Sequence, residues 1–462
     1  MIEIDAPGSV RALMERLWAH GHAAYVVGGS VRDALLGRRA EDWDLATDAR
    51  PDRLLAIFPG AVYENRFGTV AVRDGGAQHE VTTFRTDHEY ADFRRPHHVE
   101  FGDDVRLDLA RRDFTANAIA WGAEAVPGDP AVGSGAAARG DDPTPAIVDP
   151  FGGVADTRAR VLRAVGEPAA RFQEDALRMV RAVRLATVLD FVIDPPTLAA
   201  IREHAPLAEH VSGERLAAEL GKLLTSERPS TGLRLMGDAG LLDVLLPDLA
   251  QQRGVAQNKI PGEDLWDHTL RTVDAAPANH PVVRLAALLH DIGKPATIAD
   301  GPFRGHEVVG ADLAERLLDR LHLPRAATER VIHLVRNHMF TYGPEWGDSG
   351  VRRFIQRVGI DSIGDLFALR QADNIGSGFP ADAHALNELR ARVDAEIAAS
   401  VVLDRSRLAV RGDDLIAELG VPAGPRLGRI LESLLDRVIA DPQLNDRATL
   451  LLLAESMLTE DR

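Results

Sequence analysis

The chain has 462 residues, which predicts about three domains, and its 27% charged and 45% hydrophobic residues are typical of a soluble globular protein. It contains no cysteine, which excludes disulfides, thiolate metal sites and a cysteine nucleophile. Its net charge of −17 argues against a protein coated in nucleic acid but leaves room for a local basic groove. The N-terminus lacks a signal-peptide pattern and no apolar run approaches about 20 residues, so we expect a cytoplasmic protein that does not enter a membrane.

The first informative segment is a short apolar strand, residues 24–27, that leads into Gly28 and Gly29 and then a helix. Glycine allows a backbone to approach a ligand closely, and a helix N-terminus offers free N–H groups to a phosphate. Arg32 adds a charged donor, and Ser30 with Asp33 has the spacing of a capping box. The alternative for the glycines alone is a plain strand–turn–helix connection.

Two aspartates follow at the start of the next predicted strand. Alternation along a strand would place Asp42 and Asp44 on one face and Trp43 and Leu45 in the core. Carboxylates about 6–7 Å apart can hold Mg²⁺, and such sites activate an attacking hydroxyl and stabilise a leaving phosphate. A solvated turn is the usual alternative for Asp-x-Asp, but the nearby glycine turn favours a metal site.

The remaining pattern predicts an α+β head with a mixed sheet, followed by an all-helical body. Residues 67–72 and 80–84 are rich in β-branched and aromatic residues, as strands are, and residues 123–147 are typical of an exposed insertion. Helical spacing dominates from about residue 156, as in 176–189, 213–224 and 282–289, with irregular breaks at 251–262, 343–350 and 376–380.

Six motifs in the first half of the chain resemble, in order, those of the class II tRNA nucleotidyltransferase and poly(A) polymerase family. They occupy residues 28–33, 42–45, 111–118, 149–153, 174–178 and 214–224. The heads of that family belong to the DNA polymerase β-like nucleotidyltransferases. The resemblance therefore implies such a head and a template-independent transfer of nucleotides to RNA 3′ ends.

The resemblance also implies roles for particular residues. Asp42 and Asp44 would be catalytic and bind Mg²⁺, and Asp175 with Arg178 would read the base edge of the nucleotide. A carboxylate accepts from an exocyclic amine and an arginine donates to a ring nitrogen or carbonyl, which suits cytosine and adenine. The nucleotide would further contact Gly28, Gly29, Ser30, Arg32, Arg111, Arg112, Asp113, Asn117, Arg181 and Arg184.

Asp175, Arg178, Arg181 and Arg184 recur every three residues and so share one helical stripe. A solvated helix face is the common explanation of such a stripe. Because apolar residues such as Val180 place the rest of this helix in packing, we interpret the stripe as facing phosphates.

Two segments favour complete CCA addition over poly(A) synthesis. Residues 64–70 lack the basic signature of the poly(A) polymerases, and residues 90–96 resemble the flexible loop of full CCA-adding enzymes. The expected substrates are therefore a tRNA 3′ end, CTP and ATP, with no role for DNA. A poly(A) or A-adding enzyme is one alternative, and a phosphohydrolase whose head only binds RNA is another.

A second constellation surrounds His290 and Asp291, which follow an apolar run. Histidine and aspartate are ligands of Mn²⁺, Fe²⁺, Ni²⁺ and Mg²⁺. The order of these residues resembles the HD phosphohydrolase superfamily, which implies four metal ligands, His268, His290, Asp291 and Asp373, and a second metal position at His306 and His338. The sequence leaves open whether this site hydrolyses phosphate esters on RNA ends or is a structural remnant.

These observations predict four domains: a nucleotidyltransferase (palm) domain over 1–150, a helical neck that selects bases and binds RNA over 151–255, an HD domain over 256–378, and a helical tail that contacts tRNA over 379–462.

Overall fold

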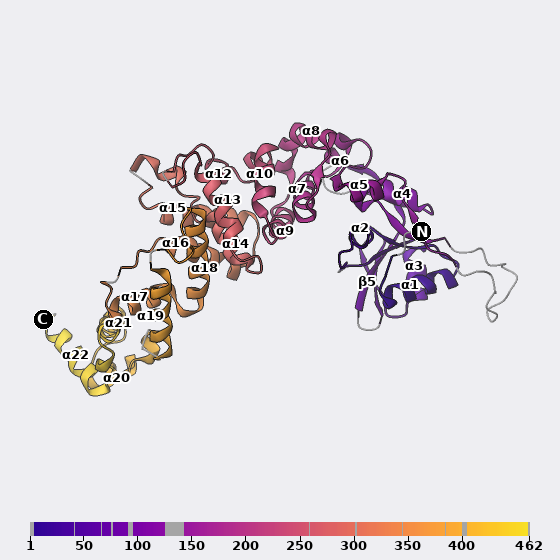
Figure 1. Ribbon diagram of the computed structural model, residues 1–462. Coiled ribbons are helices and arrows are strands. Elements are labelled where there is room, and N and C mark those ends of the chain that lie inside the picture. The colour runs from indigo at the N-terminus through magenta and orange to yellow at the C-terminus, as the bar shows by residue number, and fades with distance from the viewer. Residues whose placement is uncertain are drawn as a thin grey trace. The chain divides into compact units, whose positions relative to one another are not determined.

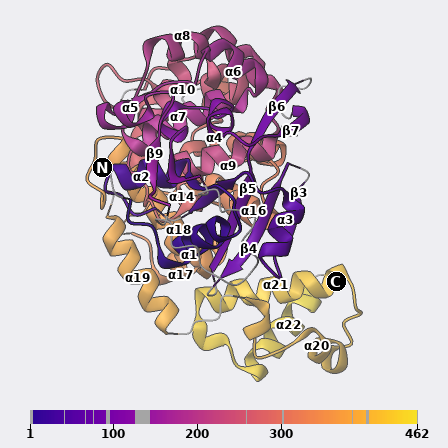
Figure 2. The ribbon, with the colours of Figure 1, turned by 90° about the vertical axis from the view of Figure 1, so that its right-hand side faces the viewer.

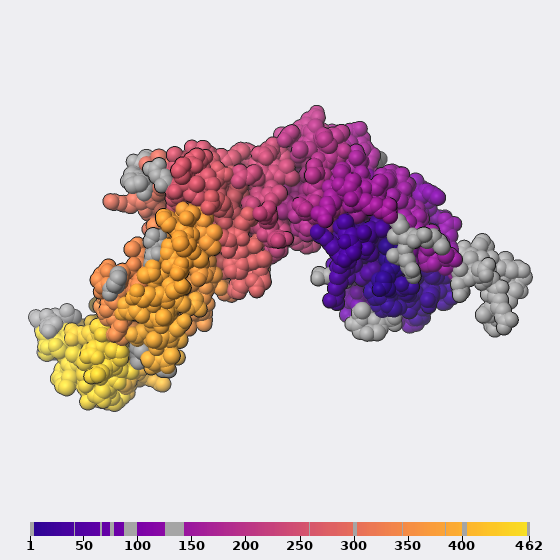
Figure 3. Space-filling view, in the orientation of Figure 1, coloured from indigo at the N-terminus to yellow at the C-terminus, as the bar shows by residue number. Residues whose placement is uncertain are grey.

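The computed structural model divides into two compact units, Met1–Pro247 and Asp248–Arg462, coloured from indigo to magenta and from rose to yellow in Figure 3. It describes residues 4–40, 42–65, 67–74, 77–90, 96–124, 143–257, 259–300, 303–343, 345–383, 385–399 and 404–460. Much of the predicted flexible loop (91–95) and of the predicted insertion (125–142) therefore lies outside the described residues. Among the described helices, none combines the length and apolarity needed to span a bilayer.

Unit 1 is built on a seven-stranded mixed sheet, as the sequence predicted. Its strands are ordered β3-β4-β5-β2-β1-β8-β9, and β2 pairs with β5 in parallel while the other neighbours are antiparallel. The strands are β1 (Ala24–Val27), β2 (Asp44–Thr47), β3 (Val62–Asn65), β4 (Thr69–Asp74), β5 (Ala77–Thr83), β8 (Ala120–Ala123) and β9 (Ala146–Val148). A separate hairpin pairs β6 (Arg85–Tyr90) with β7 (Pro96–Phe101), and two short strands, β10 (Val161–Leu162) and β11 (Val192–Ile193), pair in parallel.

Helices cover both faces of the sheet because its strands alternate between two apolar cores. Helices α1 (Gly8–Ala19) and α3 (Pro51–Ile57) pack on one face, against residues such as Val26 and Leu45 (Figures 1 and 2). Helix α4 (Val105–Ala110) packs on the other face, against Val27 and Phe84. The turn between β1 and helix α2 (Gly29–Leu35) therefore has packed cores on both sides.

The second half of unit 1 is helical, as expected from about residue 156. Its helices are α5 (Gly153–Ala159), α6 (Pro168–Glu174), α7 (Leu177–Leu189), α8 (Pro195–His204), α9 (Gly213–Leu224), α10 (Pro229–Asp238) and α11 (Leu241–Leu245). Helices α7 and α9 pack along each other, through residues such as Val183 and Leu220 that are buried on each.

The described residues of unit 2 are all helical or irregular. Its helices are α13 (Leu265–Ala275), α14 (Pro281–Leu289), α15 (His306–Arg320), α16 (Arg325–Asn337), α17 (Asp348–Val358), α18 (Ile360–Gly376), α19 (Leu386–Ala398), α20 (Gly412–Leu419), α21 (Pro425–Ala440) and α22 (Arg447–Glu460); α12 (Pro247–Ala250) spans the boundary between the units. Helices α13, α14, α16 and α18 pack on one another, and α20–α22 share a smaller core around Leu415 and Leu434.

Candidate functional site

A hollow of about 740 Å³ opens in unit 1 beside the glycine turn. Every residue that the sequence predicted for the nucleotide site lines it, from Gly28 to Arg184, together with both predicted catalytic aspartates. Segments nearly 160 residues apart in the chain therefore meet around one space. The hollow is the candidate nucleotide site.

The two glycines at its edge each lie close to an arginine side chain. Gly28 has φ +78°, in the left-handed region that favours glycine, and a Cβ there would lie 3.0 Å from Nη1 of Arg112. A Cβ at Gly29 would lie 3.3 Å from Nη2 of Arg32. Two guanidinium groups thus approach the turn as closely as the absence of side chains allows.

The predicted capping box at the start of α2 is wrong. The N-cap of α2 is Gly28, so Ser30 lies inside the helix, where its hydroxyl donates to the carbonyl of Val27 at 3.3 Å. The Asp33 carboxylate instead accepts from Nε of Arg32 at 2.9 Å. Because the glycine takes the N-cap position, the helix begins too early for the Ser–Asp spacing to act as a cap.

The two aspartates line the same hollow, although not through strand alternation. Strand β2 begins only at Asp44, so Asp42 precedes it, while Trp43 and Leu45 pack in the core as predicted. Desolvation by the surrounding protein raises the pKa of the Asp44 carboxyl. The positive charge of Arg112 acts against this shift, and the negative charge of Asp42 adds to it. A cation bound at both carboxylates would relieve this cost, so the pair fits a divalent metal.

A continuous network joins the remaining predicted residues. Arg32 donates to the amide oxygen of Asn117, whose Nδ2 donates to Oδ1 of Asp113 at 3.1 Å. Nη1 of Arg181, on α7, donates to Oδ2 of Asp113 at 3.0 Å. Burial alone would raise the pKa of Asp113, but Arg181 and Asn117 outweigh it and hold this pKa below its usual range. The network fixes α2, α7 and the turn at Asn117 in one arrangement.

The predicted base-reading pair is held by neighbours of opposite charge. Asp175 lies just before α7, and Arg215 of α9 donates to its two oxygens at 3.0 and 2.6 Å. Arg178 donates to Glu174 at 2.6 Å and to the carbonyl of Arg111 at 3.2 Å. Both side chains are about 8% exposed, so their orientation is set by these contacts.

Sequence reasoning missed several residues of the site. Asp108 is 1% exposed and accepts from Arg111 at 2.7 and 2.9 Å and from Arg112 at 3.2 Å. Glu219 of α9 accepts from Arg181 at 3.2 Å and from Arg184. Asp108 stands outside the six motifs and carries no local signal, whereas Glu219 lies in the motif at 214–224, which was not assigned a nucleotide contact. The hollow is also lined by Asp33, Arg38, Arg39 and Lys222.

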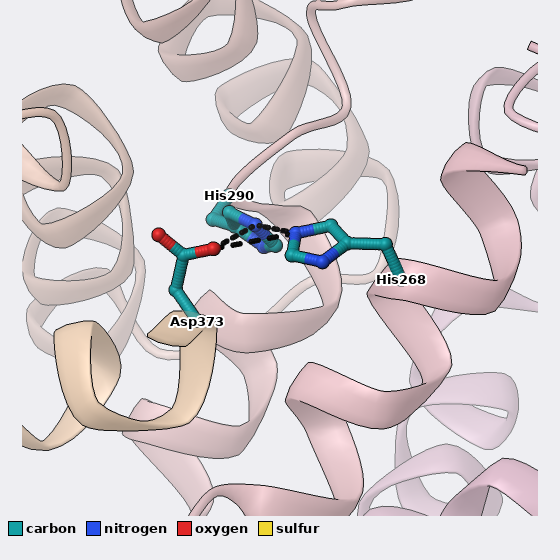
Figure 4. A group of neighbouring side chains, drawn as sticks. All are labelled: His268, His290 and Asp373. Carbon is teal, nitrogen blue, oxygen red and sulfur yellow. Dashed lines mark hydrogen bonds and ion pairs between the residues drawn. The ribbon is translucent and has the colours of Figure 1, made fainter. Parts of the chain in front are cut away.

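In unit 2, the six predicted HD residues form one buried cluster. His268 comes from α13, His290 and Asp291 follow α14, and Asp373 lies in α18; His306 and His338 lie at the start of α15 and the end of α16. His268, His290 and Asp373 make one group whose donor atoms lie within 4.8 Å of one another (Figure 4), and Asp291, His306 and His338 make a second. The sequence predicted the members but not this division.

The hydrogen bonds of the histidines prepare their other nitrogen for a cation. Nδ1 of His290, His306 and His338 lies 2.7–2.8 Å from a backbone carbonyl, which only accepts, so Nδ1 carries the proton and Nε2 presents a lone pair. Nε2 of His306 and Nε2 of His338 nevertheless face each other at 3.2 Å. Two facing lone pairs repel unless a cation lies between them, so this cluster also fits metal ions.

Asp291 joins the two groups. Its Oδ2 lies 3.2 Å from Nε2 of His268 and 3.1 Å from Nε2 of His290, and its Oδ1 lies 3.2 Å from Nε2 of His306. Burial alone would raise the pKa of Asp291, but the positive charge of Lys294, 2.6 Å away, helps to hold it well below its usual range. A charged carboxylate shared between two groups of ligands is suited to two neighbouring cations.

Two lysines that sequence reasoning left out of the site border this cluster. Nζ of Lys294 lies 2.6 Å from Oδ2 of Asp291, and Nζ of Lys259 lies 3.5 Å from Oδ1 of Asp373. The chain has only three lysines, and the third, Lys222, lines the hollow of unit 1. The signal that could have identified them is this rarity among 53 basic residues.

The mixed sheet, the glycine turn and the aspartate pair in an arginine-lined hollow define a nucleotidyltransferase. Comparison with known proteins agrees: residues 24–163 match the Poly A polymerase head domain, residues 190–253 the probable RNA and SrmB-binding site of polymerase A, and residues 265–372 the HD domain.

Similarity to individual proteins shows which family of nucleotidyltransferases the chain resembles. A CCA-adding enzyme of Geobacillus kaustophilus is 33% identical over 444 residues, which cover 94% of this chain and 93% of that one. One of Geobacillus stearothermophilus is 44% identical over 239 residues, about half of each chain (52% and 54%). The crystal structure of Bacillus stearothermophilus CCA-adding enzyme in complex with CTP superposes with a TM-score of 0.70 at 30% identity and covers 98% of both chains. The chain belongs to the CCA-adding enzyme family.

Proposed function

We propose that the protein adds C, C and A to tRNA 3′ ends from CTP and ATP, without a template. The observation that carries this proposal is the hollow of unit 1, in which an aspartate pair faces eight arginines and one lysine. Such a lining suits a triphosphate that must be held beside a reactive centre. The similarity to CCA-adding enzymes over nearly the whole chain supports the same activity, and the reaction takes place in the cytoplasm, where these substrates occur.

The roles of the residues follow from their places in the hollow. Asp42 and Asp44 would hold Mg²⁺, which when bound would supply charge neutralisation at the reacting phosphate and activation of the attacking 3′ oxygen. The guanidinium groups of Arg32, Arg111 and Arg112, which line the same hollow as the glycine turn, bind the triphosphate. Their positions are fixed before the nucleotide arrives, because carboxylates such as Asp108 already orient them.

Base selection belongs to Asp175 and Arg178. Asp175 accepts from the exocyclic amine of cytosine or adenine, and Arg178 donates to the ring. Arg215 orients the carboxylate of Asp175, since it donates to both oxygens. Uracil and guanine carry a carbonyl oxygen at the position where cytosine and adenine carry this amino group, so the carboxylate would face an acceptor instead of a donor.

The test is an incubation of the full chain with Mg²⁺ and a tRNA that lacks its CCA end. With CTP alone, we expect two added nucleotides; with CTP and ATP together, three; with ATP alone, none. Long tails from ATP alone would support the poly(A) alternative instead. Absence of any addition would reject the proposal for the head.

A second activity is favoured by the cluster in unit 2. We propose that its two groups of ligands, Asp291 among them, would hold divalent ions (Mn²⁺, Fe²⁺, Ni²⁺ or Mg²⁺), and that the site hydrolyses phosphate esters. The observation that supports it is the division of six ligands into two groups around one carboxylate. Paired cations stabilise both the attacking and the leaving oxygen in such reactions. Metal content by elemental analysis, alongside hydrolysis of a chromogenic phosphate ester, tests both parts.

A further inference from the structure

Unit 2 contains a hollow of about 440 Å³ that belongs to neither centre. It lies at the start of α17 and is lined by Trp346, Gly347, Ser349, Gly350, Arg353, Phe354 and Arg357. The lining has two arginines and, among the described residues, no carboxylate. In a chain with a net charge of −17, such a composition needs an explanation.

The three arginines of α17 are used differently. Arg352 is 8% exposed and serves the fold: it donates to Glu396 of α19 and to the carbonyls of Ile439 and Ala440. Arg353 and Arg357 are exposed, and neither makes an ion pair within the described part of the chain. They stand one helical turn apart, where like charges repel and weaken a helix slightly. A bound anion would remove that repulsion.

The aromatic part of the hollow is held in place. Trp346 is partly buried, and its ring packs against Tyr342 and Phe354 with centroids 5.6 and 6.1 Å apart. Arg392 of α19 donates to the carbonyl of Trp346 at 2.6 Å and pairs with Asp348 at 2.9 Å. Arg392 therefore fixes the loop that carries the ring and neutralises the acidic residue next to the hollow.

We infer that this hollow binds an unpaired nucleotide of the tRNA, with the base stacked on Trp346 and the phosphate between Arg353 and Arg357. Aromatic rings stack on bases of any sequence, and arginines hold the adjacent phosphate. In RNA, loops and ends offer unstacked bases, whereas duplex regions do not. The inference rests on the proposed function, because the substrate is taken to be tRNA.

The test removes the two charges and keeps the fold. In the whole chain, the Arg353→Ala/Arg357→Ala variant should bind a tRNA lacking its CCA end about tenfold more weakly. The slope of log affinity against log salt concentration should also become shallower by about one to two, since one or two phosphate contacts are lost. The KM for tRNA should rise, while kcat and the KM for CTP stay unchanged. The control, Arg316→Ala/Arg320→Ala, removes two exposed arginines that also stand one helical turn apart, on α15 of the same unit, and should change affinity less than threefold.

Trp346→Phe keeps a ring in the aromatic cluster and should weaken binding about two- to threefold, because the stacking surface shrinks. Equal tRNA affinity in the double variant and its control would overturn the inference. It would also be overturned if the double variant bound AMP more weakly than the wild type but bound tRNA equally well, because the hollow would then be a site for a free nucleotide. The proposed function is scored separately, by nucleotide addition in the wild type. A wild type that extends tRNA while the double variant binds like the control would leave the function standing and reject only this site.

Discussion

The hollow of unit 1 and the cluster of unit 2 are both rich in charge, but their charges are arranged for opposite ligands. In unit 1, eight arginines and one lysine outnumber six carboxylates around an open space. In unit 2, four histidines and two aspartates are almost completely buried with donor atoms directed at one another. The first arrangement has spare positive charge and suits an anion; the second has spare lone pairs and suits cations.

The two regions also differ in the groups that orient their functional side chains. The arginines of unit 1 are oriented by carboxylates such as Asp108, Asp113 and Glu219, so side chains orient side chains. In unit 2, backbone carbonyls orient the rings of His290, His306 and His338. Because the two sets share no residue, each centre should work without the other.

The largest effect is expected at the aspartate pair. Asp42→Ala or Asp44→Ala should lower the rate of nucleotide addition about a thousandfold or more, because a ligand of the catalytic ion is lost. The melting temperature should stay near that of the wild type, since both side chains are exposed toward the hollow. Asp52→Ala, an exposed change on α3, serves as the control. Wild-type rates in either variant would reject the assignment.

The second prediction concerns the independence of the centres. His290→Ala/Asp291→Ala should remove the divalent metal from unit 2 and leave nucleotide addition within about twofold of the wild type, because no ligand is shared. His333→Ala, in the same unit but outside the cluster, should keep the metal. Metal retained in the double variant would contradict the ligand set. Addition lost in a variant that still melts cooperatively would contradict independence.

Base selection should respond less strongly. Asp175→Ala or Arg178→Ala should reduce discrimination against UTP and GTP by about 10- to 100-fold, the range expected for one lost base contact. Binding of the triphosphate should change little, because Arg32 and Arg112 remain in place. Competition between CTP and UTP measures this effect, with Arg202→Ala, a change at an exposed residue of α8, as the control. Unchanged preference in both variants would refute the base-reading role.

The smallest effect is expected on the free energy of unfolding and its dependence on pH, when Asp108 is replaced. Burial raises the pKa of Asp108, but Arg111 and Arg112 outweigh it, so the folded pKa lies below the usual range. The charged form therefore stabilises the fold at neutral pH, and this contribution disappears as the pH falls through the folded pKa. Asp108→Asn should cost about 3 kcal/mol at pH 7, since it breaks ion pairs of a buried carboxylate and leaves two half-buried arginines without this partner, and the difference from wild type should shrink in acid.

Urea unfolding at several pH values checks this sign. Asp103→Asn provides a matched control, because Asp103 pairs with Arg50 at 3.1 Å but is 80% exposed, so its loss should cost at most about 1 kcal/mol. A gap between Asp108→Asn and wild type that widens toward acid pH would show that the carboxylate is not held charged by its arginines.

How much could be predicted from the sequence depended on how local each signal was. Helix α9 begins and ends where its apolar spacing predicted, and β1 coincides with its apolar run before Gly28. The nucleotide site followed from the resemblance, since its motifs lie in short segments that the fold brings together. The HD residues followed in the same way, although they are spread over more than 100 positions without a local pattern.

What could not be predicted depends on tertiary contacts. Asp108 and Glu219 matter because of the arginines they meet, and Arg215 because α9 packs beside Asp175. The capping box failed because a glycine with positive φ took the N-cap position, which no spacing rule reveals. The hollow beside Trp346 escaped notice because its segment reads as an irregular break.

The most direct test of the account is to sequence the tRNA 3′ ends made by three full-length proteins: the wild type, Asp44→Ala, and His290→Ala/Asp291→Ala. Each receives a tRNA without its CCA end, together with CTP, ATP and Mg²⁺. The account predicts CCA from the wild type and from the double variant, and unextended tRNA from Asp44→Ala. CCA ends from Asp44→Ala, or unextended ends from a well-folded double variant, would contradict it.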